Sequence, residues 1–235
     1  MRAMILSAGL GTRMRPLTEY KPKPLLEVGG KPLIVWHINR LKEAGFKDII
    51  INVAYLGNMI IDYLGSGSKY GVNILYSDEQ IEGGLETAGG IIKALPLLSD
   101  TFLVVNGDIW TDFNYNSNFK LQNETLAHII LVDNPPHNLG GDFYLDGTDR
   151  KYTFSGIGYY SKKMFKDLEY GKLKLAPILF RAVKDNRLTT EYYNGKWYDI
   201  GTPERLEILN KEINYSIAKQ IETPLSIITN TTKKY

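Results

Sequence analysis

Apolar runs alternate with segments of helical spacing along most of the chain. The runs that predict strands, several of them buried on both faces, lie at residues 4–6, 49–53, 72–76, 102–105 and 127–132. Between them, Ile34, Ile38 and Leu41 fall on one face of a helix for which Pro32 suits the first position. This alternation predicts an α/β fold with a mostly parallel sheet flanked by helices, and ligands at the carboxyl ends of its strands.

The pattern changes from about Gly141 onward. Short strands, including one over 152–160, precede further helix. We expect this part to form a small lobe grafted onto the first half of the chain. The prediction is a single domain over residues 1–213, with halves at about 1–110 and 111–213.

A closing helix is predicted near the C-terminus. Thr202 and Pro203 are typical of an N-cap and a first helical position. The apolar stripe of this helix consists of Leu206, Leu209 and Ile213. The chain then turns polar, and we expect a loosely docked tail over 214–235.

Composition narrows the class of protein. With 235 residues and 43% apolar content, the chain can bury one substantial core, and its formal net charge of +2 gives no basis for a nucleic-acid partner. Cysteine is absent, which fits a reducing compartment. The first apolar run is broken by Gly9, unlike a secretory signal, and no stretch approaches the roughly 20 apolar residues of a membrane span. We therefore expect a cytoplasmic protein without a membrane partner.

The most distinctive segment follows the first apolar run. Gly9 and Gly11 allow the backbone to approach a ligand closely and to turn N–H groups toward it. Cations follow within a dozen residues, at Arg13, Arg15, Lys21 and Lys23. This combination favours a triphosphate ligand, and the alternative is a solvated basic loop.

Two familiar glycine loops do not match this segment. The P-loop closes with Gly-Lys-Ser/Thr, a triplet that the sequence lacks. The dinucleotide fingerprint needs a third glycine where this chain has Met14, and it carries no cluster of cations. The segment therefore calls for a different kind of nucleotide site.

The same segment resembles the signature of the sugar-phosphate nucleotidyltransferases, G-x-G-T-R…P-x-T…P-K-P…K-P. The matching residues are Gly9, Gly11, Thr12, Arg13, Pro16, Thr18, Pro22, Lys23, Pro24, Lys31 and Pro32. Within that superfamily the likeness is strongest to the bacterial N-acetylmuramate α-1-phosphate uridylyltransferases of peptidoglycan (cell-wall) recycling. The stretches that carry it lie at residues 85–90, 105–112, 131–135, 141–143, 154–157, 174–177 and 197–202. The similarity extends over roughly residues 1–213 and implies a Rossmann-like nucleotidyltransferase fold with a small sugar-binding lobe.

The resemblance implies a reaction between UTP and a sugar 1-phosphate that releases pyrophosphate. An oxygen of the sugar phosphate attacks the α-phosphorus in line, and because this nucleophile is already an anion, catalysis must mainly suppress charge repulsion. Arg13 suits the leaving pyrophosphate and Lys23 the phosphates at the reacting centre, so we expect both to be catalytic. The residues expected to bind nucleotide here are Ala8, Gly9, Gly11, Thr12, Arg13 and Lys23.

A metal site is expected at the end of the predicted strand 102–105. Asp108 follows Asn106-Gly107 at this strand end, and Asp199 likewise follows an apolar and aromatic run. Mg²⁺ needs only one or two carboxylates when phosphates and water supply its other ligands. The resemblance implies that both acids meet on one Mg²⁺; each by itself is also a common turn residue.

The glycine-rich segment 83–90 is expected to read the base. Its backbone N–H and C=O groups can lie against the imide edge of a pyrimidine. By the resemblance, Glu86, Thr87 and Gly89 join the nucleotide site, and Glu86 favours UTP over the dTTP of thymidylyl relatives, which have Gly there. The alternative is a flexible loop that caps a helix.

Sugar binding is assigned to Asn106, Asp142 and the backbone around Gly156. Asp142 can accept hydrogen bonds from sugar hydroxyls or an amide, and it is equally typical of a turn. A Glu-Lys-Pro run that grips the sugar phosphate in many members of the superfamily is absent here. The sequence does not choose among its possible replacements, which are Arg150, Lys151 and Lys174.

Three functions are left in competition. The first is synthesis of UDP-N-acetylmuramate, the second is activation of glucose 1-phosphate or mannose 1-phosphate, and the third is a non-catalytic module that binds sugar nucleotides. The presence of Arg13, Lys23, Asp108 and Asp199 together favours catalysis. No hexapeptide repeat is visible, which removes one common trimerisation device and favours a monomer.

Overall fold

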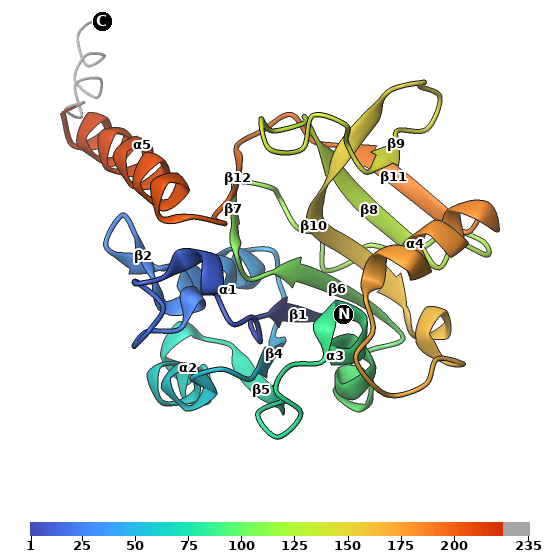
Figure 1. Ribbon diagram of the computed structural model, residues 1–235, viewed down its shortest axis with the longest axis horizontal. Helices are drawn as coiled ribbons and strands as arrows, with labels where there is room; N and C mark the ends of the chain where they lie inside the picture. The colour runs from blue at the N-terminus through green and yellow to red at the C-terminus, as the bar shows by residue number, and fades with distance from the viewer. Residues whose placement is uncertain (223–235) are drawn as a thin grey trace, which may run out of the picture.

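An eight-stranded sheet forms the centre of the protein, of which the computed structural model describes residues 1–222 (Figure 1). Its strands are β1 (Arg2–Leu6), β4 (Asp48–Val53), β5 (Asn73–Asp78), β6 (Thr101–Asn106), β8 (Ala127–Val132), β9 (Phe143–Tyr144), β10 (Lys151–Ser161) and β11 (Leu188–Tyr192). The strand order is β11-β8-β10-β6-β1-β4-β5, with β9 paired to β10. The strands predicted from the apolar runs and from 152–160 are all present.

The sheet is mixed and mostly parallel, as predicted. β1 pairs in parallel with β4 and β6, β4 with β5, and β8 with β11. β10 is antiparallel to β6, β8 and β9. The carboxyl ends of β1, β4, β5 and β6 therefore share one edge of the sheet, where the loops that follow them can meet.

Helices cover both faces of the sheet. α1 (Leu33–Glu43) and α2 (Gly57–Leu64) pack on one face, and α3 (Glu86–Ala94) and α4 (Leu175–Lys184) pack on the other. The strand alternation sets this division: in β1, Ala3 and Ile5 join the first cluster and Met4 joins the second. Both sides of β1 are thus buried, which explains its continuous apolar run.

A third cluster lies beside the sheet, under α5 (Pro203–Glu222). α5 packs on a ribbon of β7 (Ile109–Thr111) and β12 (Trp197–Asp199), and on the small pair β2 (Glu27–Val28) and β3 (Lys31–Pro32). The predicted cap is present, because the Arg205 N–H donates to Thr202 Oγ1 at 3.5 Å. The helix continues past residue 213 to Glu222, so the first part of the segment expected as a tail is helical.

Residues 223–235, the remainder of that expected tail, lie outside the described residues. The limits of 1–213 and 214–235 as domain and tail remain a prediction. No helix in the described part of the chain is long and apolar enough to cross a membrane.

His37 is buried on α1, with 2% of its surface exposed. Burial lowers the pKa of this imidazole from 6.5 to about 4, although a hydrogen bond with the backbone of Ile109 and the nearby Asp108 carboxylate act in the opposite direction. The imidazole is therefore neutral in the folded protein at pH 7.

We predict that His37 makes folding sensitive to acid. The unfolded chain protonates His37 near pH 6.5 and the folded protein only near pH 4, so stability falls as pH drops between these values. From pH 7 to pH 5 this residue should remove about 2 kcal/mol of unfolding free energy. Urea unfolding of the wild type and of His37→Gln at both pH values measures the difference, and an equal pH dependence in the two proteins would contradict the prediction.

Candidate functional site

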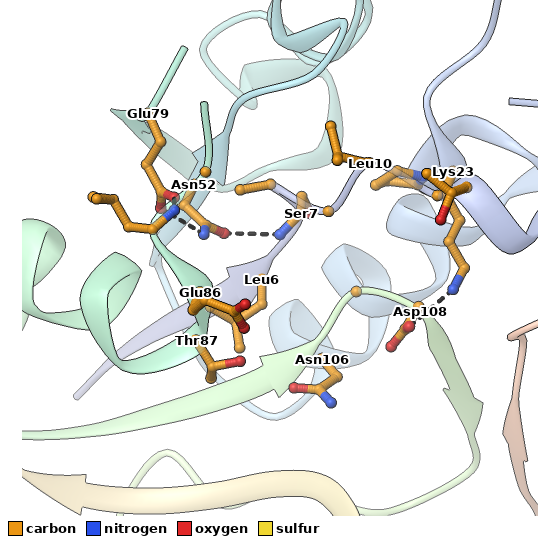
Figure 2. Close-up of a pocket in the computed structure, with 18 of the residues that line it drawn as sticks. Leu6, Ser7, Leu10, Lys23, Asn52, Glu79, Glu86, Thr87, Asn106 and Asp108 are labelled. Carbon is orange, nitrogen blue, oxygen red and sulfur yellow. Dashed lines mark hydrogen bonds and ion pairs between the residues drawn. The ribbon is translucent and has the colours of Figure 1, made fainter. Parts of the chain in front are cut away.

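A cavity of about 500 Å³ opens at the carboxyl ends of β1, β4, β5 and β6 (Figure 2). Two loops supply most of its wall: the first loop, residues 7–13 after β1, and the second loop, residues 79–87 between β5 and α3. The remaining lining residues are Leu6, Met14, Lys23, Pro24, Asn52, Asn106, Gly107, Asp108, Lys172 and Gly201. The position agrees with that expected for a ligand site in an open α/β sheet.

The first loop contributes every nucleotide residue predicted from it. Ala8, Gly9, Gly11, Thr12 and Arg13 all line the cavity. The loop is anchored at its C-terminal end, because Thr18 Oγ1 donates to the Gly11 carbonyl at 2.7 Å and the Met14 side chain that follows is fully buried. The backbone that faces the cavity is therefore held in place before any ligand contacts it.

Lys23 lines the cavity and contacts Asp108. Its Nζ is 2.8 Å from Asp108 Oδ2, and only 11% of its side chain is exposed (Figure 2). An ion pair with one partner this well covered holds the ammonium group in a defined place. The predicted catalytic lysine and the predicted metal ligand are thus neighbours.

The ribbon of β7 and β12 brings the two predicted metal ligands to one place. Asp199 pairs opposite Ile109, and the Ile200 N–H donates to the carbonyl of Asp108 at 2.9 Å. Asp199 Oδ2 also contacts Arg205 Nη1 at 2.6 Å and His137 Nε2 at 3.0 Å. The backbones of the two acids are therefore adjacent, although Asp199 itself does not line the cavity. That both carboxylates hold one Mg²⁺ remains a prediction.

Arg13 lies close to the second acid. A Cβ placed on Gly201 would lie 3.2 Å from Arg13 Nη1, 3.1 Å from Asp199 Oδ1 and 3.0 Å from Arg205 Nη1. These three side chains therefore converge on the same glycine. Arginine forks at this point suit the oxygens of a polyphosphate.

The donor set suits a hard divalent cation. One or two carboxylates are enough for Mg²⁺ when phosphate and water oxygens complete its octahedron. Within residues 1–222 there is no group of three or more His, Cys, Asp or Glu residues that could hold a metal by protein ligands alone. A metal bound here would accordingly depend on the phosphates of a nucleotide for the rest of its ligands.

The glycine-rich segment 83–90 places two of its three predicted residues in the cavity. Glu86 and Thr87 line it, whereas Gly89 does not. The Gly89 N–H donates to the Leu173 carbonyl at 3.2 Å, and a Cβ at this position would collide with the Gly171 carbonyl oxygen. Gly89 therefore allows α3 to pack against the 171–173 segment.

The predicted sugar residues divide in a similar way. Asn106 lines the cavity. Gly156 lies directly against the Asn106 side chain, because a Cβ on Gly156 would be 2.6 Å from Asn106 Nδ2. Asp142 is outside the lining: its Oδ2 accepts from the Phe154 N–H at 2.9 Å and its Oδ1 from Asn138 Nδ2 at 3.1 Å. Both oxygens of Asp142 therefore accept hydrogen bonds within the second half of the chain, one from Asn138 and one from the backbone of β10.

Several lining residues were not foreseen from the sequence. Ser7, Asn52 and Glu79 are polar residues at or just after the ends of buried strands, a position that could have drawn attention to them. Lys172 is the one side chain that residues 111–213 contribute to the lining, apart from the glycine at 201. The candidate cations Arg150, Lys151 and Lys174 do not line the cavity.

Comparisons with known proteins agree with this geometry. The family model described as "Nucleotidyl transferase" matches residues 2–140. The N-acetylmuramate α-1-phosphate uridylyltransferase of Neisseria meningitidis is 53% identical over 88% of this chain and 96% of its own length. The enzyme of that name from Caulobacter vibrioides is 31% identical over 86% of this chain and 92% of its own. A solved Bacillus anthracis structure, assigned as a glucose-1-phosphate thymidylyltransferase, has the same fold, with a TM-score of 0.80, 24% identity, and coverage of 91% of this chain and 95% of its own.

We predict that Gly156→Ala disturbs the site through Asn106. Gly156 has φ +81°, and Gly147, with φ +79° and no atom within 4 Å of the place that a Cβ would take, is a matched control. Both alanine variants should lose about 1 kcal/mol of unfolding free energy because of the left-handed backbone. Only Gly156→Ala should lose a further 1–3 kcal/mol or so through overpacking, together with activity. Urea unfolding and turnover measure the two effects, and equal behaviour of the two variants would contradict the role given to the Asn106 contact.

Proposed function

Because the chain belongs to the nucleotidyl transferase family, we propose that it transfers the uridylyl group of UTP to N-acetylmuramate α-1-phosphate, with release of pyrophosphate. The observation that carries this proposal is the 53% identity to the Neisseria meningitidis enzyme over 96% of that enzyme's length. The cavity supports it, because Arg13, Lys23 and Asp108 line one wall and Glu86 and Thr87 another.

The chemical step needs charge control more than proton transfer. A phosphate oxygen of the sugar 1-phosphate attacks the α-phosphorus, the bond from this phosphorus to the leaving pyrophosphate breaks, and negative charge grows on that leaving group. Arg13, at the rim by Gly201, stabilises the pyrophosphate, and Lys23 stabilises the equatorial oxygens of the reacting phosphorus. Since the Lys23 ammonium is held by Asp108, little reorganisation of this cation is required when charge develops.

Asp108 and Asp199 would hold Mg²⁺. Bound there, the ion would neutralise phosphate charge and polarise the α-phosphorus. Each acid also contacts a cation of this chain, Lys23 at 2.8 Å and Arg205 at 2.6 Å. These cations offset the negative charge that the two acids bring to this end of the ribbon.

The acceptor sugar is placed beside Asn106. This side chain faces the cavity from the end of β6, and Gly156 on the neighbouring strand β10 lets the backbone of the second half approach it closely. Asp142, which fixes the lobe to β10, orients this wall of the acceptor site. Glu86 and Thr87, on the opposite side, offer backbone N–H groups at the start of α3 to the uracil.

A substrate panel tests the proposal. We expect pyrophosphate release with UTP and N-acetylmuramate α-1-phosphate to exceed that with N-acetylglucosamine, glucose or mannose 1-phosphate by at least about tenfold in kcat/KM, and to stop when Mg²⁺ is chelated. A preference for a neutral hexose phosphate would overturn the choice of acceptor. Absence of release from every pair, with tight binding of a UDP-sugar, would indicate a binding module.

The loss of either proposed catalytic cation should lower turnover far more than the loss of a cation outside the cavity. Arg13→Ala and Lys23→Ala each leave an anion uncompensated at closest approach, so we expect turnover to fall by about 10²–10³ with the fold retained. Matched controls are Arg15→Ala, at an exposed position, and Lys21→Ala, whose ammonium pairs with the exposed Glu27 at 3.3 Å. Pyrophosphate release and circular dichroism give the comparison. Wild-type turnover in either catalytic variant would refute its assignment.

A further inference from the structure

A chain of buried hydrogen bonds in the wall of the cavity links the ends of three strands. The Ser7 N–H donates to Asn52 Oδ1 at 2.8 Å, and Asn52 Nδ2 donates to Glu79 Oε1 at 2.8 Å (Figure 2). Glu79 Oε2 then accepts from the Leu85 N–H, also at 2.8 Å. Ser7, Asn52 and Glu79 are 4%, 3% and 0% exposed. Water therefore cannot replace these bonds if one of them is lost.

The second loop is wrapped around Glu79. The Gly83 and Gly84 N–H groups donate to the Glu79 carbonyl at 3.0 and 3.3 Å, in addition to the Leu85 bond to its carboxylate. Positive φ angles at Gly83, Gly84 and Glu86, of 69°, 90° and 60°, turn the backbone in this way. Three successive amides thus face inward to Glu79, and those of Glu86 and Thr87 are the next ones free to meet a ligand.

The chain of bonds also fixes how the two loops face each other. Its two ends are backbone amides, Ser7 in the first loop and Leu85 in the second, so moving either loop breaks a buried bond. The loops are close at this point, because a Cβ on Gly84 would lie 3.6 Å from the Ala8 carbonyl oxygen. On the helix side, a Cβ on Gly90 would lie 2.6 Å from Glu79 Oε1, so the glycine at this position leaves room for the carboxylate.

We propose that Asn52 and Glu79 are positioning residues that set the spacing between the first loop, which holds the phosphates, and the second loop, which holds the base. Both side chains line the cavity, and their polar atoms are engaged in the chain of bonds. This inference rests on the proposed use of a uridine triphosphate, because a ligand that reaches from one loop to the other is what makes their spacing matter. The consequence is that the pair controls affinity for the nucleotide and leaves the chemical step nearly unchanged.

The hydrogen-bond pattern suggests a direct test. The two outer donors are the backbone amides of Ser7 and Leu85, whose positions are fixed. Residues 52 and 79 must therefore each offer an acceptor to one of these amides, and one of the two must also donate a hydrogen bond to the other. Asn52→Asp alone sets two carboxylates against each other, and Glu79→Gln alone leaves one buried donor unmatched. The double variant Asn52→Asp with Glu79→Gln restores all three bonds and the net charge, with donor and acceptor exchanged between the two residues.

We expect each single variant to raise KM and Kd for UTP by about tenfold or more, with kcat within about twofold, and the double variant to return to within about threefold of wild type. Steady-state pyrophosphate release and titration with UTP give these values. A matched control is Asn73→Asp, because Asn73 Nδ2 makes a similar bond to Asp48 Oδ1 at 3.0 Å across the same two strands, at their exposed opposite ends. The control should leave KM unchanged.

Two results would overturn the proposal. Single variants with lower unfolding midpoints but an unchanged KM would show a purely structural role, since a smaller folded fraction lowers apparent kcat only. A double variant that stays as weak as Glu79→Gln would show that Glu79 contacts the base directly. If Asn52→Asp does not fold, the comparison of KM for UTP between Glu79→Gln and the double variant still tests whether restoring the hydrogen bonds restores affinity. Failure of the proposed function is separate, because it would appear as absence of UTP turnover and UTP binding in the wild type.

Discussion

The pairing of β7 with β12 is the contact on which the rest of the site depends. These three-residue strands come from opposite halves of the chain, and their register sets Asp199 opposite Ile109, next to Asp108. Such a short ribbon has few hydrogen bonds of its own and is stabilised by packing. Trp110 contacts Trp36 and Tyr198 through its ring, and Leu206, Leu209 and Ile213 of α5 cover the same cluster. The C-terminal helix thus stabilises the place where two distant acids meet.

Charge around these acids is balanced by side chains from several elements. Lys23 accompanies Asp108, while Arg205 and His137 accompany Asp199, and Arg13 lies beside the same glycine as Asp199. Bringing two phosphate-bearing substrates together adds negative charge to this region, and the cations there interact strongly with it because Lys23 is largely shielded from water. The arrangement therefore matches the electrostatic demand of phosphoryl chemistry better than that of acid–base catalysis.

The elements of the fold could be predicted well from the sequence because their signals are local. The apolar runs mark strands buried on both faces, and Thr202-Pro203 marks the start of α5 within one residue. The first loop was likewise predicted, since glycines and cations cluster within a short segment. The site could be predicted less completely. That Asp108 and Asp199 lie near each other was expected only from the family resemblance. The pairing of two strands far apart in the sequence cannot be inferred from the spacing of their residues.

Contacts that depend on tertiary packing were not accessible from the sequence. Gly89 and Asp142 have the residue types of ligand-binding positions, yet the structure uses their polar or small character to join α3 to the 171–173 segment and the lobe to β10. Asn52 and Glu79 were missed for the opposite reason. A single polar residue at a strand end is common, and only the fold shows that two of them bond each other between the loops.

The position of β10 has a consequence for how the chain could be divided. This strand from the second half lies between β6 and β8, hydrogen-bonded to both, and β12 completes the ribbon begun by β7. A fragment that stopped near residue 110 would leave β6 as an apolar open edge, with Phe102, Leu103 and Val105 deprived of their cover. The nucleotide half is therefore not a self-sufficient module that could be shuffled between proteins by itself; recombination within this architecture has to exchange surface loops and leave the interleaved strands intact.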